Sequence, residues 1–207
     1  VMPATTPDVK VRQTRALDAE VVLAGHSFEE ARERADILCA ERGLVFVHPF
    51  DDAEIIAGQG TIALEMIEDG PRFDAMITPI GGGGLAAGIS LALKERRPEV
   101  RIVGVVCQPG YTIADGIAVK YKGELAFEIL DRTLDDTVTV SDDEISEALV
   151  LCVERTKLLV EGAGAVAGVF ARALDRPPLE GAPLDAATAL AALEASRTPI
   201  VLMFDDV

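Results

Sequence analysis

Short runs rich in β-branched residues alternate with helix-like segments along most of the chain, and this alternation limits the folds that the chain can adopt. The runs Phe73–Ile80 and Val100–Val106 have the character of buried strands, and a helix-like segment, Leu85–Arg96, lies between them. Parallel strands need a crossover connection of this kind, because a short hairpin turn cannot join them. The pattern therefore predicts an open α/β fold, with a mostly parallel sheet and helices on both faces.

Further signals extend the pattern in both directions. Ser27 with Glu30, and Ser141 with Glu144, have the spacing of a capping box, which predicts that a helix begins after each serine; the first of these helices is expected to reach about Arg42. The other expected strands are Val21–Gly25, Leu44–Phe50, Thr137–Val140 and Pro199–Phe204. The other expected helices are Ile56–Ile67, Ile145–Leu159, Glu161–Leu174 and Leu184–Ser196.

Composition narrows the class of protein. With 207 residues, 49% of them hydrophobic, the chain is long enough for one large domain or two small ones. A formal net charge of −16 argues against binding to nucleic acid or to an anionic membrane surface. No apolar run approaches the roughly 20 residues that span a bilayer, and the N-terminal residues do not resemble a signal peptide. We expect a cytoplasmic protein.

Residues that commonly bind metals are few. The 3 cysteines and 2 histidines show neither CxxC nor HxxH spacing, so no metal site is expected. Cys39, Cys107 and Cys152 are expected to be reduced core residues. His48, at the end of a strand-like run, is expected to have a structural role.

The run Gly81–Gly84 is the main candidate for a functional site. It follows an expected strand and precedes an expected helix, an arrangement that places backbone N–H groups and the positive end of a helix around one point, where a phosphate can bind. No GK[ST] follows, so the run is not a Walker loop, and it fits GxGxxG poorly. Taken alone, the glycines are equally compatible with a tight turn.

Longer blocks around the glycines carry a resemblance. The chain contains, in order, LVFVHPFDDAEIIAGQGTIALEMIED, TPIGGGGLAAGISLALKERRPEVRIVGV, TIADGIAVKYKGELAFEIL and LLVEGAGAVA. With VMPATTPDVKVRQTRALDAEVVLAG at the start, these blocks closely resemble the threonine dehydratases, pyridoxal-phosphate enzymes of the tryptophan-synthase-β-like fold. The similarity extends over most of residues 1–173.

The resemblance implies a cofactor and a reaction. Backbone N–H groups of Gly81, Gly82, Gly83 and Gly84 would bind the phosphate of pyridoxal phosphate, and Leu85 would complete the turn. Glu161, with Asp115, would line the cofactor pocket; stabilisation of a helix N-terminus by each carboxylate explains their presence equally well. The implied substrate is a small β-hydroxy amino acid, from which the β-hydroxyl departs by elimination and which ends as a 2-oxo acid and ammonia. Residues 1–53 would be the remaining part of a small domain, 54–207 would be the large cofactor-binding domain, and the protein would be a homodimer or homotetramer.

The sequence departs from the family pattern in places that matter for catalysis. The family's Schiff-base lysine, in an S-F-K-x-R-G-like motif, and its S-x-x-N-H-type substrate loop would lie upstream of Val1, so the catalytic residues are unknown and the fold is expected to be incomplete. At the other end PIVLMFDDV stands where the family has SGGN, whose serine pairs with the pyridine nitrogen. Val106 replaces a glutamate that binds a divalent cation in some relatives, which again predicts no metal site.

Two explanations and three functions remain open at this stage. The sequence is either part of a longer enzyme or a truncated relative that has lost the amine chemistry. The leading function is that of a threonine or serine dehydratase. The alternatives are a non-catalytic phosphate-binding or assembly module that lacks the lysine, and a hydrolase that uses Ser90 or Thr78.

Overall fold

The computed structural model describes residues 1–108, 110, 112–119, 121–169 and 200–202 of the chain. It divides the protein into two compact units, Val1–Val47 and His48–Val207, which we describe separately as the N-terminal unit and the sheet unit. Whether these units correspond to a small domain and a large cofactor-binding domain, with the boundary near residue 53, stays a prediction.

Two helices make up most of the N-terminal unit: α1 (Asp8–Ala16) and α2 (Phe28–Arg42). The side chain of Ser27 caps α2 by accepting a hydrogen bond from the N–H of Glu30, as its spacing predicts. The helix ends at Gly43, whose φ of 64° places it in the left-handed region that glycine adopts most easily.

Two expected strands, one in the N-terminal unit and one that runs across its boundary, do not form. Val21–Gly25 forms only an isolated bridge, in which Leu23 pairs with Met2, and Leu44–Phe50 forms no strand. In that segment Val45 is 88% exposed and Val47 is 67% exposed, so neither side chain has the buried environment of a strand. A β-branched run becomes a strand only when a neighbouring strand pairs with it along its length and covers one face. Among the described residues, Val21–Gly25 exchanges backbone hydrogen bonds with residues 2–4 over a single bridge, and no strand pairs with Leu44–Phe50.

The sheet unit contains the parallel sheet that the sequence predicts. Its four strands lie in the order β3-β2-β1-β4, and every pair is parallel. The strands are β1 (Ala75–Pro79), β2 (Arg101–Cys107), β3 (Asp136–Val140) and β4 (Ile200–Leu202). The two central strands, β1 and β2, carry long runs of buried residues, as expected for strands that are covered on both faces.

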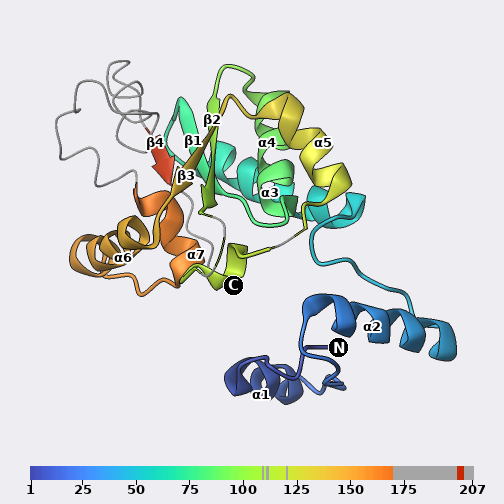
Figure 1. The fold of residues 1–207 in the computed structure, drawn as a ribbon. Helices are drawn as coiled ribbons and strands as arrows, with labels where there is room; N and C mark the ends of the chain where they lie inside the picture. The colour runs from blue at the N-terminus through green and yellow to red at the C-terminus, as the bar shows by residue number, and fades with distance from the viewer. Residues whose placement is uncertain (109, 111, 120, 170–199, 203–207) are drawn as a thin grey trace. The chain divides into compact units, whose positions relative to one another are not determined.

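Helices cover both faces of the sheet, which confirms the predicted architecture (Figure 1). On one face Met76 of β1 and Ile102 of β2 pack with Leu93 of α4; this layer contains α3 (Ala53–Asp69), α4 (Gly84–Arg96) and α5 (Glu124–Thr133). On the other face Ile77 and Val103 pack with Ile145; this layer contains α6 (Asp142–Leu151) and α7 (Gly162–Ala165). Successive strand side chains point to opposite faces, so neighbouring residues of β1 belong to different cores.

Some helix boundaries differ from the expected ones. The expected helix Ile145–Leu159 is α6 followed by a π-helical turn, Cys152–Thr156, and the expected helix Glu161–Leu174 begins as α7 and continues as a 3₁₀ turn, Val166–Gly168. The expected helix Leu184–Ser196 lies outside the described residues. The sequence patterns do not predict α5, the helix between β2 and β3. No helix in the described ranges is long and apolar enough to cross a membrane.

Candidate functional site

Gly81–Gly84 form a loop between the carboxyl end of β1 and the first turn of α4, and we call this segment the glycine loop. Gly83 is the N-cap residue of α4 and has a φ of 98°, a backbone conformation that other L-residues rarely adopt. No side chain caps the helix. The N–H groups of the first helical turn have no partner within the helix and are therefore directed toward whatever lies beyond its end.

Close packing explains why this loop needs glycines. A Cβ at Gly81 would lie 2.9 Å from the Cα of Ile117, and one at Gly82 would lie 2.5 Å from the ring of Phe50. A Cβ at Gly84 would overlap the backbone carbonyl of Phe50. Other protein segments therefore cover part of the loop so closely that no larger residue fits there.

Phe50 is held in place by its own segment. The Nδ1 atom of His48 accepts hydrogen bonds from the N–H groups of Phe50 (3.2 Å) and Asp51 (2.7 Å). The rings of His48 and Phe50 meet edge to face, with centroids 4.7 Å apart. The structural role expected for His48 is thus confirmed, because Nδ1 acts as the acceptor in a tight turn.

Asp51, the residue after Phe50, contacts the first turn of α5. Its carboxylate accepts hydrogen bonds from the N–H groups of Glu124 and Ala126, both at 3.0 Å. Just before α5, the N–H of Gly123 donates to the carbonyl of Gly82 at 3.1 Å. The beginning of α5 is therefore bonded both to Asp51 and to the glycine loop.

The predicted pocket residues Asp115 and Glu161 lie beside this arrangement. Asp115 begins the 3₁₀ turn Asp115–Ile117, whose last residue packs against Gly81. A Cβ at the middle residue, Gly116, would lie 3.0 Å from Oε1 of Glu161. Glu161 is half-buried and precedes α7, whereas Asp115 is exposed. The structure thus brings the turn that carries Asp115 next to both Glu161 and the glycine loop.

Leu85 is oriented differently from the glycines. Its side chain packs against the hydrophobic core between the sheet and the helices α3 and α4. Only its backbone N–H, in the first turn of α4, is in a position to serve a ligand.

The side chains proposed for hydrolysis gain no support. Ser90 and Thr78 are both fully buried. The hydroxyl of Ser90 donates to the carbonyl of Ala87 and lies 2.7 Å from the hydroxyl of Thr133. A nucleophilic serine requires an adjacent base, and neither of these contacts of Ser90 is to an imidazole or a carboxylate.

Lys94 has a structural role at the other end of α4. Lys94 is half-buried; its amine donates to the carboxylate of Asp135 (2.8 Å) and to the carbonyl of Val100 (2.9 Å). It lies in the last turn of α4, whereas the glycine loop precedes the first. Lys94 therefore stabilises the opposite end of the helix.

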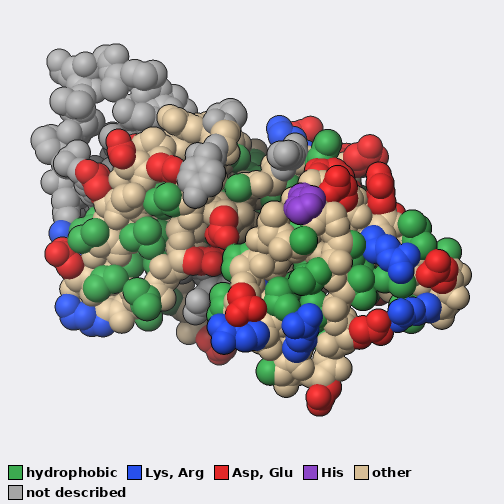
Figure 2. All heavy atoms as spheres, turned by 60° about the horizontal axis from the view of Figure 1, so that its bottom comes forward, with side chains coloured by type: hydrophobic (Ala, Val, Ile, Leu, Met, Phe, Trp, Pro, Cys, Tyr) green, Lys and Arg blue, Asp and Glu red, His purple; other side chains and the backbone are tan. Residues whose placement is uncertain are grey.

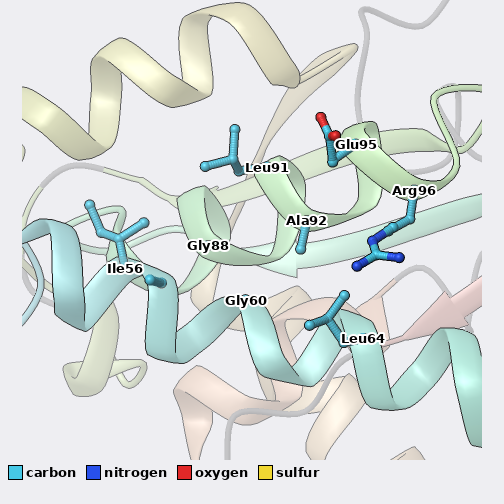
Figure 3. Close-up of a pocket in the computed structure, with 9 residues that line it drawn as sticks. Ile56, Gly60, Leu64, Gly88, Leu91, Ala92, Glu95 and Arg96 are labelled. Atoms are coloured by element: carbon cyan, nitrogen blue, oxygen red, sulfur yellow. The ribbon is translucent and has the colours of Figure 1, made fainter.

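A groove lies along the crossing of α3 and α4, apart from the glycine loop (Figure 3). Its volume is about 430 Å³, and its lining is mostly apolar, with Ile56, Leu64, Leu91 and Ala92 among the lining residues. Arg96 and Leu64 lie at the same end of the groove in Figure 3. It contains none of the glycine-loop residues, so we do not assign it to a phosphate.

The glycine loop fits a phosphate group. It combines the uncapped N-terminus of a helix with a left-handed glycine, so that adjacent N–H groups point outward at the positive end of the helix dipole. It also lies at the carboxyl end of a parallel strand, where open α/β sheets bind ligands. In the described part of the chain, no group of at least three His, Cys, Asp or Glu residues is placed to hold a metal ion.

Comparison with known proteins agrees with this arrangement. The sequence profile of the family described as "Pyridoxal-phosphate dependent enzyme" matches residues 1–195. L-Threonine ammonia-lyase from Thermotoga maritima is 43% identical over 184 residues, which is 80% of this chain and 46% of the relative, so this chain spans about half the length of that protein.

Solved structures show the same fold. Maize serine racemase superimposes with a TM-score of 0.84 at 26% identity, over 99% of this chain and 64% of that one. Threonine deaminase isoform 2 from Solanum lycopersicum gives 0.78 at 30% identity, over 100% of this chain and 58% of that one. The glycine loop, the parallel sheet and the profile match lead to one conclusion: the chain belongs to the family of pyridoxal-phosphate dependent enzymes.

Proposed function

We propose that this protein is a pyridoxal-phosphate-dependent dehydratase that converts L-threonine or L-serine to a 2-oxo acid and ammonia: the β-hydroxyl leaves as water, and one water is taken up again when ammonia is released. The observation that carries the proposal is the glycine loop at the uncapped start of α4, in a chain whose relatives include L-threonine ammonia-lyases. When bound, pyridoxal phosphate supplies an electron-accepting ring for the reaction at the α-carbon of the amino acid.

The residues of this chain would bind and orient the cofactor. In this proposal the N–H groups of Gly81–Gly84 and Leu85 donate hydrogen bonds to the phosphate oxygens, and the α4 dipole favours the negative charge. Glu161, with Asp115, lines the pocket next to the loop. The reactive amine is not assigned to any lysine of this sequence.

The protein's surface fits a small, soluble substrate better than a nucleic acid. The net charge is −16, and on the face shown in Figure 2 the Lys and Arg side chains are scattered among Asp and Glu rather than gathered in one patch. Such a surface repels a phosphate backbone, so the phosphate site must act locally, through backbone N–H groups. We further propose that the protein is cytoplasmic and forms a homodimer or homotetramer, which light scattering would test.

A binding experiment tests the phosphate site. The purified 207-residue chain is titrated with pyridoxal phosphate, with pyridoxal and with inorganic phosphate, and binding is followed by calorimetry. We expect pyridoxal phosphate to bind and inorganic phosphate to compete with it, while pyridoxal binds much more weakly because it lacks the charged group. Equal affinity for pyridoxal and pyridoxal phosphate would contradict the assignment of the glycine loop.

Product formation and chemical trapping test the activity. Release of 2-oxobutanoate from L-threonine or pyruvate from L-serine would support the dehydratase, and the absence of both would exclude it for the chain tested. Borohydride reduction in the presence of pyridoxal phosphate, read by intact mass and peptide mapping, would identify any lysine that reacts with the cofactor. An unmodified mass of 21.9 kDa would favour the alternative function, a non-catalytic phosphate-binding or assembly module.

One structural observation favours that alternative. Lys94 is engaged with Asp135 far along α4, and Lys122 lies over the ring of Phe127 with its amine 4.6 Å from the centroid. Lys157 donates to the carbonyl of Glu154. Among the described residues these lysines have contacts that suit structural roles, so phosphate binding without product formation is the result that would establish the module.

A further inference from the structure

Asp51 connects the segment before α3, the first turn of α5 and, through these, the glycine loop. We propose that Asp51 is a positioning residue for the cofactor-phosphate site: its carboxylate holds in place the two aromatic residues that cover the glycine loop. This inference rests on the proposed function, because it concerns the same phosphate site.

The Asp51 carboxylate caps the N-terminus of α5. One oxygen accepts from the N–H of Glu124 and the other from the N–H of Ala126, so a single side chain satisfies two of the unpaired donors of α5. A Cβ at Gly123 would lie 2.5 Å from Oδ1 of Asp51, so the carboxylate can approach only because residue 123 is glycine. The negative charge also stabilises the positive end of the helix.

The beginning of α5 in turn contacts the glycine loop. Gly123, at the N-cap of α5, donates its N–H to the carbonyl of Gly82. In the first turn of α5, the ring of Phe127 and the methyl group of Ala126 lie 3.0 and 3.1 Å from the position of a Cβ on Gly83. The left-handed residue that starts α4 is thus packed directly against α5.

The residue before Asp51 also contacts the glycine loop. The preceding residue, Phe50, places its ring against Gly82 and its carbonyl against Gly84. Fixing Asp51 on α5 therefore also fixes Phe50. Phe50 and Phe127 both pack against the glycine loop. Asp51 joins the segments that carry them, because it follows Phe50 in the chain and accepts hydrogen bonds from the first turn of α5.

The order of the glycine loop should affect its affinity for phosphate. A loop that is already ordered loses little conformational entropy when it binds a ligand, whereas a loosened loop has to be ordered at the expense of affinity. Removing the Asp51 carboxylate frees the first turn of α5 and detaches it from the segment that carries Phe50, which keeps its hydrogen bonds to Nδ1 of His48. We therefore expect weaker phosphate binding even though Asp51 itself donates no hydrogen bond to the phosphate.

Asp52 provides a matched control in the next position. Its carboxylate also caps a helix, accepting from the N–H groups of Glu54 (2.9 Å) and Ile55 (3.2 Å), but that helix is α3. The same substitution at Asp52 removes a cap of the same kind without affecting the contacts between α5 and the glycine loop.

The experiment compares Asp51→Ala and Asp51→Asn with Asp52→Ala and Asp52→Asn. The first measurement uses no ligand: hydrogen exchange at the N–H of Gly123, followed by NMR. We expect exchange at Gly123 to be about tenfold faster in Asp51→Ala than in Asp52→Ala, as expected for the loss of one cap. Asp51→Asn retains one oxygen acceptor and should give an intermediate value.

The second measurement is the affinity of each variant for inorganic phosphate and for pyridoxal phosphate. We expect an affinity loss of about tenfold for Asp51→Ala and little change for Asp52→Ala at a similar thermal midpoint. Equal affinity losses at the two positions would overturn the role of Asp51. If the unsubstituted protein binds neither compound, the proposed function fails instead, and the exchange measurement at Gly123 still decides whether Asp51 orders the loop.

Discussion

The N-terminal unit and the sheet unit start from similar sequence signals and end in different structures. Both contain β-branched runs and serine-capped helices, yet only the sheet unit converts its runs into strands. Its β1 and β2 lie side by side and are covered by helices on both faces, whereas Val45 and Val47 of the N-terminal unit are largely exposed. The comparison teaches that strand formation depends on available neighbours, while helix capping depends on residues close in sequence.

The first prediction compares the two cores and has the largest expected effect. Ile77 is fully buried in the sheet unit, among residues of three strands and of α6 and α7, while Leu38 is buried in the much smaller N-terminal unit. Ile77→Ala should lower the free energy of unfolding by about 2–5 kcal/mol, because a well-packed core leaves a cavity. Leu38→Ala should lower the free energy of unfolding by less, because the few residues around Leu38 can move into the space that its side chain leaves.

Urea unfolding followed by circular dichroism gives the overall stability, and hydrogen exchange resolves the two units. We expect Ile77→Ala to speed exchange throughout β1 and β2, and Leu38→Ala to speed exchange in α2 alone. Equal costs at the two positions would mean that the N-terminal unit is packed as tightly as the sheet unit.

The second prediction tests the crossing of α3 and α4, for which the N-terminal unit has no counterpart. A Cβ at Gly88 would overlap the carbonyl of Ile56 and would lie 2.7 Å from the backbone N of Gly60, so these helices touch backbone to backbone (Figure 3). Gly88→Ala should therefore lower stability by about 1–3 kcal/mol through overpacking.

Gly58→Ala is the control for that substitution. Gly58 lies in α3, and a Cβ there meets nothing within 4 Å. Alanine at this position should raise stability by about 0.5–1 kcal/mol, because it removes a glycine from the interior of a helix. Thermal unfolding of both variants measures the contrast, and a shift of the same sign in both would contradict the close helix crossing.

The third prediction compares the helix caps of the two units. At α6 both halves of the capping box form: the hydroxyl of Ser141 accepts from the N–H of Glu144, and the carboxylate of Glu144 accepts from the N–H and the hydroxyl of Ser141. At α2 the Glu30 carboxylate instead accepts from the N–H of His26. Ser141→Ala should therefore cost about 1 kcal/mol and Ser27→Ala about 0.5 kcal/mol, as measured by thermal unfolding.

Reversal of that order would show that the N-terminal unit depends more on its cap than the sheet unit does. In that case the small core of the N-terminal unit, rather than the geometry of the cap, would set the cost. Ser141→Thr, which keeps a capping hydroxyl, serves as the control and should restore most of the stability lost in Ser141→Ala.

The sequence predicts features whose cause is local. The glycine run, the capping serines and the buried strands can be found because each depends on neighbouring residues or on a regular spacing. The cap that Asp51 provides for α5 cannot be found in this way, since the carboxylate and the N–H of Glu124 are 73 residues apart in sequence. The same holds for Phe50, whose ring meets Gly82 only once the sheet unit has folded.

The last prediction separates the two units by pH. In the N-terminal unit a hydrogen bond and ion pair with Arg42 lower the pKa of the Glu20 carboxyl below its ordinary value. In the sheet unit burial raises the pKa of the thiols of Cys107 and Cys152, and a hydrogen bond with Thr112 offsets part of the effect at Cys107. One unit therefore has a group that favours its ionised form, and the other has groups that favour their neutral form.

The signs of the two effects are opposite. The contribution of Glu20 is present above about pH 4 and is lost as the pH falls through its lowered pKa, when the carboxylate becomes protonated. The contribution of the thiols is fully present below about pH 8.5 and is lost as the pH rises through their raised pKa values. The acid effect should be small, because the Glu20–Arg42 pair is exposed and screened by solvent.

Hydrogen exchange corrected for intrinsic rates, measured from acid to alkaline pH, should show the loss in acid mainly in α2 and the loss in alkali mainly in β2 and α6. Glu20→Gln should reduce the acid effect, and Cys107→Ser with Cys152→Ser should reduce the alkaline effect. If Glu20→Gln also altered exchange in the sheet unit, the two units would share one unfolding transition, and the contrast between them would concern local packing alone.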